Sequence, residues 1–249
     1  MAIVTQRTAR RARDYVRVAG PEAEDFLQRM VSNDVSGDVC EALLLTAKGR
    51  VVAPLVVWRR GPDDFLLLTE PGLGDVVRTT LLRARFATKC EVEREEHTST
   101  IVFADGDGIP NSDYGEPAVE VLDADVEPTL GEDELELLRI EAATPAWGKE
   151  IDEKVLPAEA GLDQRAISYT KGCYPGQEPI ARLHYRGHVN RRLRVLVVER
   201  AQPGDEIVYG EKVVGRVTSA VPGRALGYLR TEVPDDAALL IGSAEARLH

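Results

Sequence analysis

The octapeptide Lys171–Glu178 (Lys-Gly-Cys-Tyr-Pro-Gly-Gln-Glu) concentrates the residue types that could do chemistry in this chain. Its thiol, Cys173, lies two residues after Lys171. The residues from Gln177 to Leu183 should form a short helix, because an acid and a proline suit a first helical turn. Cys173 would then lie just before a helix N-terminus with an ammonium group nearby, and both features favour the thiolate form. We therefore predict catalytic roles for Cys173 and Lys171.

Two glycines, Gly172 and Gly176, bracket the cysteine. We expect them to adopt backbone geometry that a Cβ would forbid and to let a ligand approach closely. The alternative is a buried structural cysteine in a glycine-containing loop, since free cysteines are among the most buried residues.

Composition narrows the class of protein. The 249 residues carry a net charge of −11, which favours a soluble protein and argues against direct nucleic-acid binding. No apolar run approaches the roughly 20 residues that cross a membrane. Cys40, Cys90 and Cys173 are odd in number and lack metal-ligand spacing, so we predict a reduced, cytoplasmic protein that holds no metal by itself.

For two charged segments, a structural interpretation is favoured over a functional one. The arginine-rich stretch from Met1 to Arg13 lacks the apolar core of a secretory signal, and a frayed basic arm is favoured over an organellar transit peptide. Asp105, Asp107 and Asp113 lie in a segment from 104 to 117 that looks like a calcium-binding repeat. Because it occurs only once, we predict an exposed acidic loop in its place.

Periodicity predicts a mixture of strands and helices. Strands are expected at 14–18, 40–46, 50–58, 65–69, 90–96 and 100–104, and helices from Pro21, at 74–85 and at 132–143. Pro54, inside a strand, indicates a sheet edge or a bulge. The irregular stretch from 149 to 169 leads into the cysteine motif and has the length of a functional loop.

The C-terminal part has a different pattern. Six strand runs separated by glycine turns follow residue 190, which predicts a small antiparallel barrel and a division into domains 1–190 and 191–249. A basic run precedes it: Arg182, His184, Arg186, His188, Arg191, Arg192 and Arg194. This run is either a solvated rim or an anchor for a polyanion, such as a multi-carboxylate tail or a phosphate backbone.

The octapeptide resembles the signature K-G-C-[FY]-x-G-Q-E of the YgfZ-type folate-binding proteins, relatives of the glycine-cleavage T-protein (aminomethyltransferase). Other matching motifs are Ser32-Asn33-Asp34-Val35, Lys48-Gly49-Arg50, Leu138-Arg139-Ile140-Glu141-Ala142 and Gly215-Arg216-Val217-Thr218-Ser219. The resemblance implies an α+β fold: a T-protein-like three-part ring of two α+β subdomains around a folate channel, plus a C-terminal antiparallel β-barrel.

The resemblance also implies a cofactor, tetrahydrofolate or a derivative, bound without a covalent bond. Glu141 would meet the pterin, because a carboxylate can accept two parallel hydrogen bonds from its ring N–H and amino group. The basic run would lie near the glutamate tail, and Trp147 would either stack on the ligand or belong to the core. The residues that could bind the cofactor are Glu141, Gly172, Tyr174, Gly176, Gln177, Glu178 and Arg182.

One departure from the family bears on activity. Aminomethyltransferases carry paired aspartates just after the hairpin glycine, and the corresponding positions here are Ala53 and Pro54, which cannot transfer a proton. We favour a folate-binding accessory protein of iron–sulphur cluster assembly or repair, linked to tRNA modification, with iron–sulphur proteins as partners. The alternatives are a one-carbon transferase that uses Asp34 or Glu141, and a folate-free scaffold.

Overall fold

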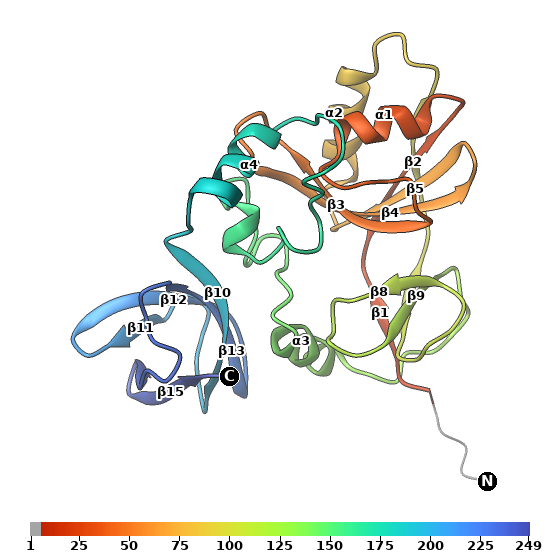
Figure 1. The fold of residues 1–249 in the computed structure, drawn as a ribbon. Helices are drawn as coiled ribbons and strands as arrows, with labels where there is room; N and C mark the ends of the chain where they lie inside the picture. Colours follow the sequence, from red (N-terminus) through yellow and green to blue (C-terminus); the bar gives the residue numbers. More distant parts are fainter. Residues whose placement is uncertain (1–5) are drawn as a thin grey trace.

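The computed structural model describes residues 6–249, which form three β-sheets (Figure 1). A five-stranded sheet with two helices forms the first part, a four-stranded sheet with one helix the second, and a closed six-stranded barrel the third. A connector and a further helix lie between the first part and the barrel (Figure 1). The predicted combination of two α+β parts and a C-terminal antiparallel barrel is confirmed.

The first part is an antiparallel sheet with the strand order β3-β4-β5-β2-β6. Its elements are β2 (Asp14–Ala19), α1 (Ala23–Met30), β3 (Val39–Leu45), β4 (Val51–Gly61), β5 (Asp64–Thr69), α2 (Gly74–Arg85) and β6 (Glu91–Glu95). Alternating residues divide between two cores, as a period of two requires. Val16 and Leu67 pack with Phe26 of α1, whereas Tyr15 and Leu66 pack with Ile109 of the second part.

Pro54 lies in an interior strand, so the expectation of a sheet edge is wrong, but the expected bulge is present. The register shifts where Leu44 faces Ala53 and Leu45 faces Val51, which leaves Val52 as the extra residue. On its other side Pro54 lies just past the end of β5, whose last residue, Thr69, pairs with Leu55. The proline therefore removes no N–H that the sheet needs.

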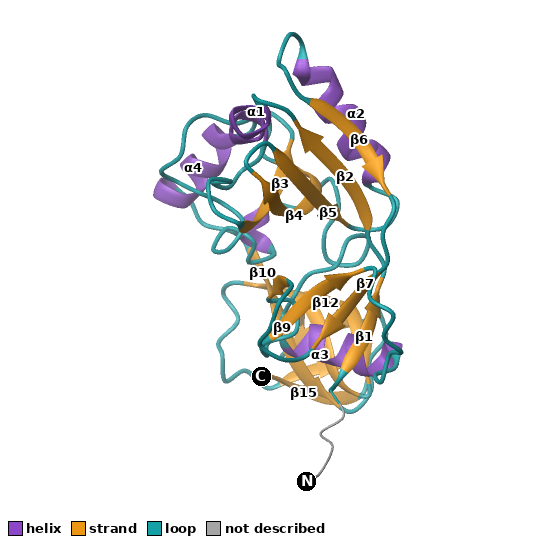
Figure 2. Ribbon diagram, turned by 90° about the vertical axis from the view of Figure 1, so that its right-hand side faces the viewer, coloured by secondary structure: helices purple, strands orange, loops and turns teal. Residues whose placement is uncertain are grey.

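The second part is a sheet with the order β1-β7-β9-β8, which lies below the first sheet together with α3 (Figure 2). Its elements are β1 (Thr8–Arg11), β7 (Ser99–Val102), β8 (Ile109–Asn111), β9 (Ala118–Leu122) and α3 (Glu132–Glu141). The expected frayed arm is wrong for residues 8–11, because β1 pairs with β7 along its whole length, and for Arg13, whose buried side chain pairs with Glu70 and Glu120. For residues 1–5, the prediction lies outside the described residues.

The segment from 104 to 117 also differs from the expected exposed loop. It contains β8, with Ile109 and Tyr114 fully buried. Asp105 and Asp107 are exposed as predicted, but the side chain of Asp113 is only 14% exposed and pairs with arginines. Among residues 6–249 there is no group of three acidic, histidine or cysteine side chains that could hold a metal ion.

The third part is a closed barrel with the order β10-β13-β12-β11-β14-β15. Its strands are β10 (Arg191–Val198), β11 (Glu206–Tyr209), β12 (Lys212–Val221), β13 (Gly223–Arg230), β14 (Leu239–Ile241) and β15 (Ala244–Leu248). All six predicted strand runs are present, and closure leaves no free sheet edge. We retain the division into 1–190 and 191–249 as our proposal for the folding domains.

The connector runs from the end of α3 to α4 (Gln177–Arg186) and contains a single-turn 3-10 helix, η1 (Pro157–Glu159). Its apolar residues form a core with the β3–β4 hairpin and the barrel, in which Ile151, Leu162 and Tyr174 pack with Leu43 and Tyr228. The connector thus joins the first part to the barrel through this core, contacts the second part through the ion pair of Arg165 with Asp113, and determines where the cysteine motif lies. Within residues 6–249, no helix is long and apolar enough to cross a membrane.

Candidate functional site

The thiol of Cys173 is exposed and lies four residues before the start of α4. The structure therefore agrees with the predicted position just outside a helix N-terminus, and the alternative of a buried structural cysteine is wrong. Cys40 and Cys90 differ. Burial raises the pKa of Cys40 to about 11 and raises the pKa of Cys90.

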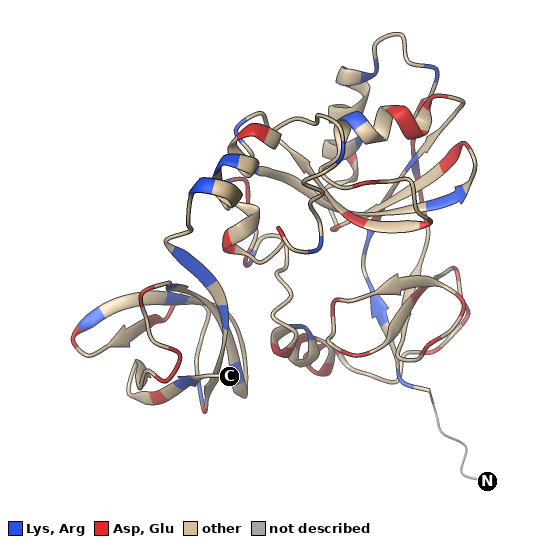
Figure 3. Ribbon diagram, in the orientation of Figure 1, with Lys and Arg blue, Asp and Glu red and all other residues tan. Residues whose placement is uncertain are grey.

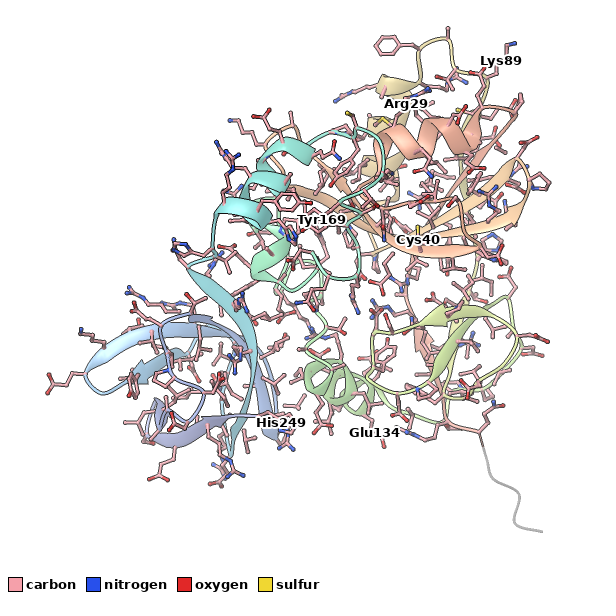
Figure 4. All side chains as sticks on the ribbon, in the orientation of Figure 1. Arg29, Cys40, Lys89, Glu134, Tyr169 and His249 are labelled. Carbon is pink, nitrogen blue, oxygen red and sulfur yellow. The ribbon has the colours of Figure 1, made fainter. Side chains whose placement is uncertain are left out.

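Lys171 is fixed by the end of the first helix. Its half-buried ammonium group donates hydrogen bonds to the carbonyl oxygens of Val31 (3.0 Å) and Asn33 (2.5 Å). Burial lowers the pKa of Lys171 to about 8, against the opposing charges of Asp34 and Cys40. In sequence this lysine lies beside Cys173. The thiol that affects the pKa of Lys171 is instead that of Cys40, at the edge of the first sheet (Figure 4).

The two glycines of the motif differ in whether their positions require a residue without a Cβ. Gly176 has a φ of +84°, and a Cβ there would lie 2.5 Å from the carbonyl oxygen of Thr46 and 3.0 Å from the Cα of Gly49. It is needed where the motif crosses the β3–β4 hairpin. Gly172 has open space around it and no positive φ, so the expectation that a Cβ is forbidden holds for Gly176 and is wrong for Gly172.

The other predicted site residues of the motif are distributed over core and surface. Tyr174 is 7% exposed, and burial raises its pKa to about 12. Gln177 is half-buried, whereas Glu178 and Arg182 are exposed on α4. None of these residues, nor Cys173, lines any of four clefts that residues 6–249 form. The motif loop is therefore a surface separate from the first of these clefts, which α4 lines with Ile180, Leu183 and His184.

The cleft that we call the first cleft lies between the connector, α4 and β10, with a volume of about 400 Å³. Tyr169 and His184 form one wall, with ring centroids 3.9 Å apart in a stacked arrangement (Tyr169 is labelled in Figure 4). Asp163, a half-buried carboxylate, lines it without an ion-pair or hydrogen-bond partner among residues 6–249. Sequence reasoning missed Asp163, because nothing in the irregular stretch distinguishes it from other loop acids.

A buried hydroxyl lies in the same wall. Thr144 lines the first cleft, is 4% exposed, and its Oγ1 has no hydrogen-bond partner among the described residues. Most buried polar atoms in proteins are paired, so such a group in a cleft wall can respond to a ligand.

Glu141 lies beside this cleft. Ala142 and Ala143, which follow it, line the wall. The carboxylate itself pairs with Arg224 of the barrel at 3.0 Å. Trp147 is half-buried and packs against the cores of both the first part and the connector, so the structure supports a core position for it.

A narrower cleft of about 50 Å³ lies between the first and second parts, and Pro54 lines it. Ala53, in contrast, is completely buried in the core of the first part. Three acids line this cleft, and each pairs with arginine: Glu41 with Arg165, Glu70 with Arg11 and Arg13, and Asp113 with Arg11, Arg13 and Arg165. These carboxylates line the same cleft as Pro54 and could in principle replace the aspartates absent at positions 53 and 54. Each of them, however, is already paired with an arginine.

Arg13 is the centre of this charge cluster, which sequence analysis missed. Its side chain is 5% exposed and pairs with Glu120 (3.1 Å), Glu70 (3.2 Å) and Asp113 (3.5 Å). Although burial alone would raise the pKa values of Glu120 and Asp113, the arginines lower both below their usual range. The acids lie 57 to 107 residues from Arg13 in sequence, so no local pattern could have revealed them.

Comparisons with known proteins agree with the motifs and the fold. Residues 190–249 match the CAF17 C-terminal beta-barrel domain. The chain is 25% identical over 288 residues to an aminomethyltransferase of Corynebacterium jeikeium, covering 86% of this chain and 74% of that protein. It is also 25% identical over 241 residues to an uncharacterised protein of Haemophilus influenzae, covering 89% and 86%.

The structure superposes on the crystal structure of the glycine cleavage system aminomethyltransferase T from Bartonella henselae. The TM-score is 0.79 at 20% sequence identity, with 94% of this chain and 81% of that chain covered. The resemblance indicated by the motifs is thus confirmed: the chain has a CAF17-type C-terminal barrel, sequence homology to aminomethyltransferases and the fold of the T-protein.

Proposed function

We propose that the protein binds tetrahydrofolate or a derivative, without a covalent bond, in the first cleft. Similarity to aminomethyltransferases over most of the chain supports a folate ligand. A volume of about 400 Å³ suits a ligand of this size, at least for its ring system. The stacked pair of Tyr169 and His184 supplies a flat aromatic wall.

The polar groups of the first cleft suit a pterin. Its neighbouring N–H and amino groups are donors that need an acceptor, and Asp163 is a carboxylate without a protein partner among the described residues. Glu141, our candidate from sequence, would have to release Arg224 to take this role. We therefore propose Asp163 as a pterin contact and keep Glu141 as a contact at the adjoining wall.

Calorimetry with tetrahydrofolate tests this assignment. Asp163→Asn should weaken binding by about tenfold or more, because a charge-assisted hydrogen bond is lost. Glu141→Ala tests the second acid, and Glu245→Gln, an exposed acid of the barrel, is the matched control that should bind like the wild type. Absence of a binding heat in the wild type would leave the folate-free scaffold as the better account.

We further propose that the protein is an accessory factor of iron–sulphur cluster assembly or repair in the cytoplasm, with iron–sulphur proteins as partners. The observation that carries this proposal is the exposed thiol of Cys173 in a chain whose aspartate positions are Ala53 and Pro54. A solvent-accessible thiolate can take a redox role or act as a transient cluster ligand. Loss of cluster supply to thiolating enzymes would explain a link to tRNA modification without direct RNA contact.

Complementation of a deletion strain tests the thiol. Cys173→Ala should fail to restore the activities of iron–sulphur enzymes, whereas Cys40→Ala, which removes a half-buried thiol, should restore them. Thermal melting of both variants controls for folding. Full recovery with Cys173→Ala would show that the thiol role is wrong.

A folate-dependent one-carbon transferase is the alternative, and the sequence similarity to an aminomethyltransferase over 86% of this chain favours it. It would need a replacement acid. Asp34 is exposed and bonded to Gln28 and Ser36, which lowers its pKa, and Glu141 pairs with Arg224. Turnover of an aminomethyl donor with tetrahydrofolate by the purified protein would establish this function, and its absence would support the accessory role.

A further inference from the structure

The second half of α2 and the loop that follows it, residues 78–89, form a surface that we call the α2 tip. It lies at the end of the first part that points away from the barrel and the second part (Figures 1 and 2). Its Phe86 is 89% exposed, more than any other large apolar side chain within residues 6–249. The four clefts that the described residues form contain no residue of the α2 tip, so the ring projects into solvent and fills no groove of its own chain.

The backbone at Phe86 is strained. The amide of Thr88 donates a hydrogen bond to the carbonyl oxygen of Arg85 at 2.9 Å, which closes a turn with Phe86 at its first central position. The φ of +45° and ψ of −120° at Phe86 match a type II′ turn, in which glycine normally occupies this position. A buried ring would offset the strain, but this ring is exposed, so folding alone does not account for the phenylalanine. The strained and exposed ring therefore points to a contact outside the chain.

The surface around the ring is basic in a strongly acidic chain. The sequence from 76 to 90 contains no aspartate or glutamate but four cations, Arg78, Arg83, Arg85 and Lys89. Figure 3 shows basic residues at the end of α2 and on the loop that follows. Within residues 6–249 none of the four forms an ion pair, whereas Arg94 on the neighbouring strand β6 pairs with two acids.

Arg29, exposed near the end of α1, adds a fifth cation. Burial raises the pKa of Cys90, and the charges of Arg85 and Arg29 oppose this rise, which places both arginines near the loop. Figure 4 labels Arg29 and Lys89 at this end of the molecule. The α2 tip thus combines one projecting ring with cations from two helices.

The net charge of −11 does not cancel this basic surface. Salt screens charges over about 8 Å at physiological ionic strength, so only groups near the loop act on a ligand there. Two acids lie beside the loop. Glu22 accepts a hydrogen bond from the backbone amide of Lys89 at 3.0 Å, and Glu91 follows Cys90 in sequence. Five cations against two acids leave the α2 tip positive.

We propose that the α2 tip binds the surface of membranes that contain anionic lipids, with the ring of Phe86 inserted among the headgroups. This inference goes beyond the proposed function and does not depend on it. Binding at a membrane surface combines burial of apolar side chains at the acyl boundary with attraction between cations and anionic lipids, and the α2 tip offers both. A folded acidic protein would need a pocket that matches the ring closely, whereas a lipid surface is fluid and adapts to a projecting side chain.

Cosedimentation of the full chain with vesicles of phosphatidylcholine that contain about 30% phosphatidylglycerol tests the proposal. The wild type should bind these vesicles at least about tenfold more tightly than vesicles of phosphatidylcholine alone, and the advantage should shrink as salt screens the charges. Arg83→Glu/Lys89→Glu should lose the advantage, because each cation near an anionic surface strengthens binding about fivefold. The matched control Arg216→Glu/Arg230→Glu reverses two exposed arginines of the barrel and should bind like the wild type.

Variants of Phe86 separate binding from folding. Phe86→Gly removes the backbone strain, so the midpoint of urea unfolding should rise while the affinity for anionic vesicles falls about tenfold. Loss of binding in a more stable protein cannot come from misfolding. Phe86→Trp should keep the affinity, and its tryptophan emission should shift to shorter wavelength when anionic vesicles are added, beyond any shift of Trp58 and Trp147 in the wild type.

Several outcomes would overturn the proposal. Equal affinity of the wild type for both kinds of vesicle, or binding to neither, would show that the α2 tip does not recognise anionic lipid. Unchanged binding by Phe86→Gly, or no emission shift in Phe86→Trp, would show that the ring does not enter the headgroup layer. If an acidic protein copurifies with the wild type but not with Phe86→Gly, and anionic vesicles do not bind, the surface belongs to a protein partner instead.

Discussion

The charge cluster around Arg13 and the loop that carries Cys173 differ in how far their side chains are exposed to solvent. The cluster joins the first and second parts with side chains that are at most 16% exposed at Arg13, Glu70, Asp113 and Glu120. The loop presents an exposed thiol with open space around Gly172. Shifted pKa values occur at Arg13, Asp113 and Glu120 in the cluster and at Lys171 and Tyr174 in the loop, so the two regions differ in exposure and not in whether pKa values are shifted.

This difference shows that perturbed ionisation alone does not locate function. Buried ion-pair networks shift pKa values as strongly as active sites do, because both remove charges from water. In the Arg13 cluster every acid has an arginine partner, which leaves no group free to transfer a proton or bind a ligand. The candidate chemistry lies instead in Cys173 and Asp163, whose side chains have no hydrogen-bond or ion-pair partner within residues 6–249.

The largest expected effect is in the cluster. Arg13→Ala leaves Glu120 and Asp113 buried without their main partner and should lower the free energy of unfolding by about 3–5 kcal/mol. The matched control is Arg7→Ala in the same N-terminal segment, where the pair with Glu116 is exposed and the loss should stay below about 1 kcal/mol. Urea unfolding measures the free energy of unfolding of both variants. Equal losses would show that the buried ion pairs of Arg13 contribute no more to stability than the exposed pair of Arg7.

Acid should weaken a second buried junction. Burial would raise the pKa of Glu136, but hydrogen bonds from Arg139 and Lys149 lower it to about 2. Because this value lies below that of the unfolded chain, the contribution is present above about pH 4.5 and is lost as the pH falls toward 2. The free energy of unfolding of the wild type should fall by about 2 kcal/mol in this range, and that of Glu136→Gln should fall by less. Urea unfolding at pH 5 and pH 3 measures both. Equal losses in the two proteins would show that the assignment to Glu136 is wrong.

A smaller effect is expected where the barrel meets the connector. The buried hydroxyl of Tyr228 donates a hydrogen bond to the carbonyl oxygen of Glu150 at 2.9 Å. Tyr228→Phe should cost about 1 kcal/mol, since it leaves that oxygen with one partner fewer. Tyr209→Phe, at an exposed barrel position, is the control that should leave the unfolding midpoint unchanged.

The smallest effect on stability is expected in the motif loop. Cys173→Ser should change the free energy of unfolding by less than about 0.5 kcal/mol, because the side chain is exposed. Its reactivity should be the largest of the three thiols. At pH 8, iodoacetamide should modify Cys173 at least about tenfold faster than Cys40, whose pKa of about 11 leaves little thiolate. Peptide mapping by mass spectrometry measures the order, and faster modification of Cys40 would contradict the contrast between the two regions.

Much of the fold followed from local patterns. The helix over 74–85 and the strands Glu206–Tyr209 and Ala244–Leu248 agree with their predicted bounds, because the periodicity of apolar residues reflects which side of an element faces the core. Errors arose where partners come from far away. The segment from 104 to 117 reads as polar by composition, yet Asp113 is buried because Arg13 and Arg165 surround it.

The sequence by itself determined most of the helices and strands, the barrel and an exposed thiol before a helix, because these depend on neighbouring residues along the chain, but it missed β1, β8 and β9 of the second part. The tertiary structure alone decided that Lys171 is held by Val31 and Asn33, and that Asp163 faces a cleft without a partner among the described residues. Each of these depends on segments that are distant in sequence and meet only when the connector joins the three parts. Their contacts are set by packing, which no local pattern encodes.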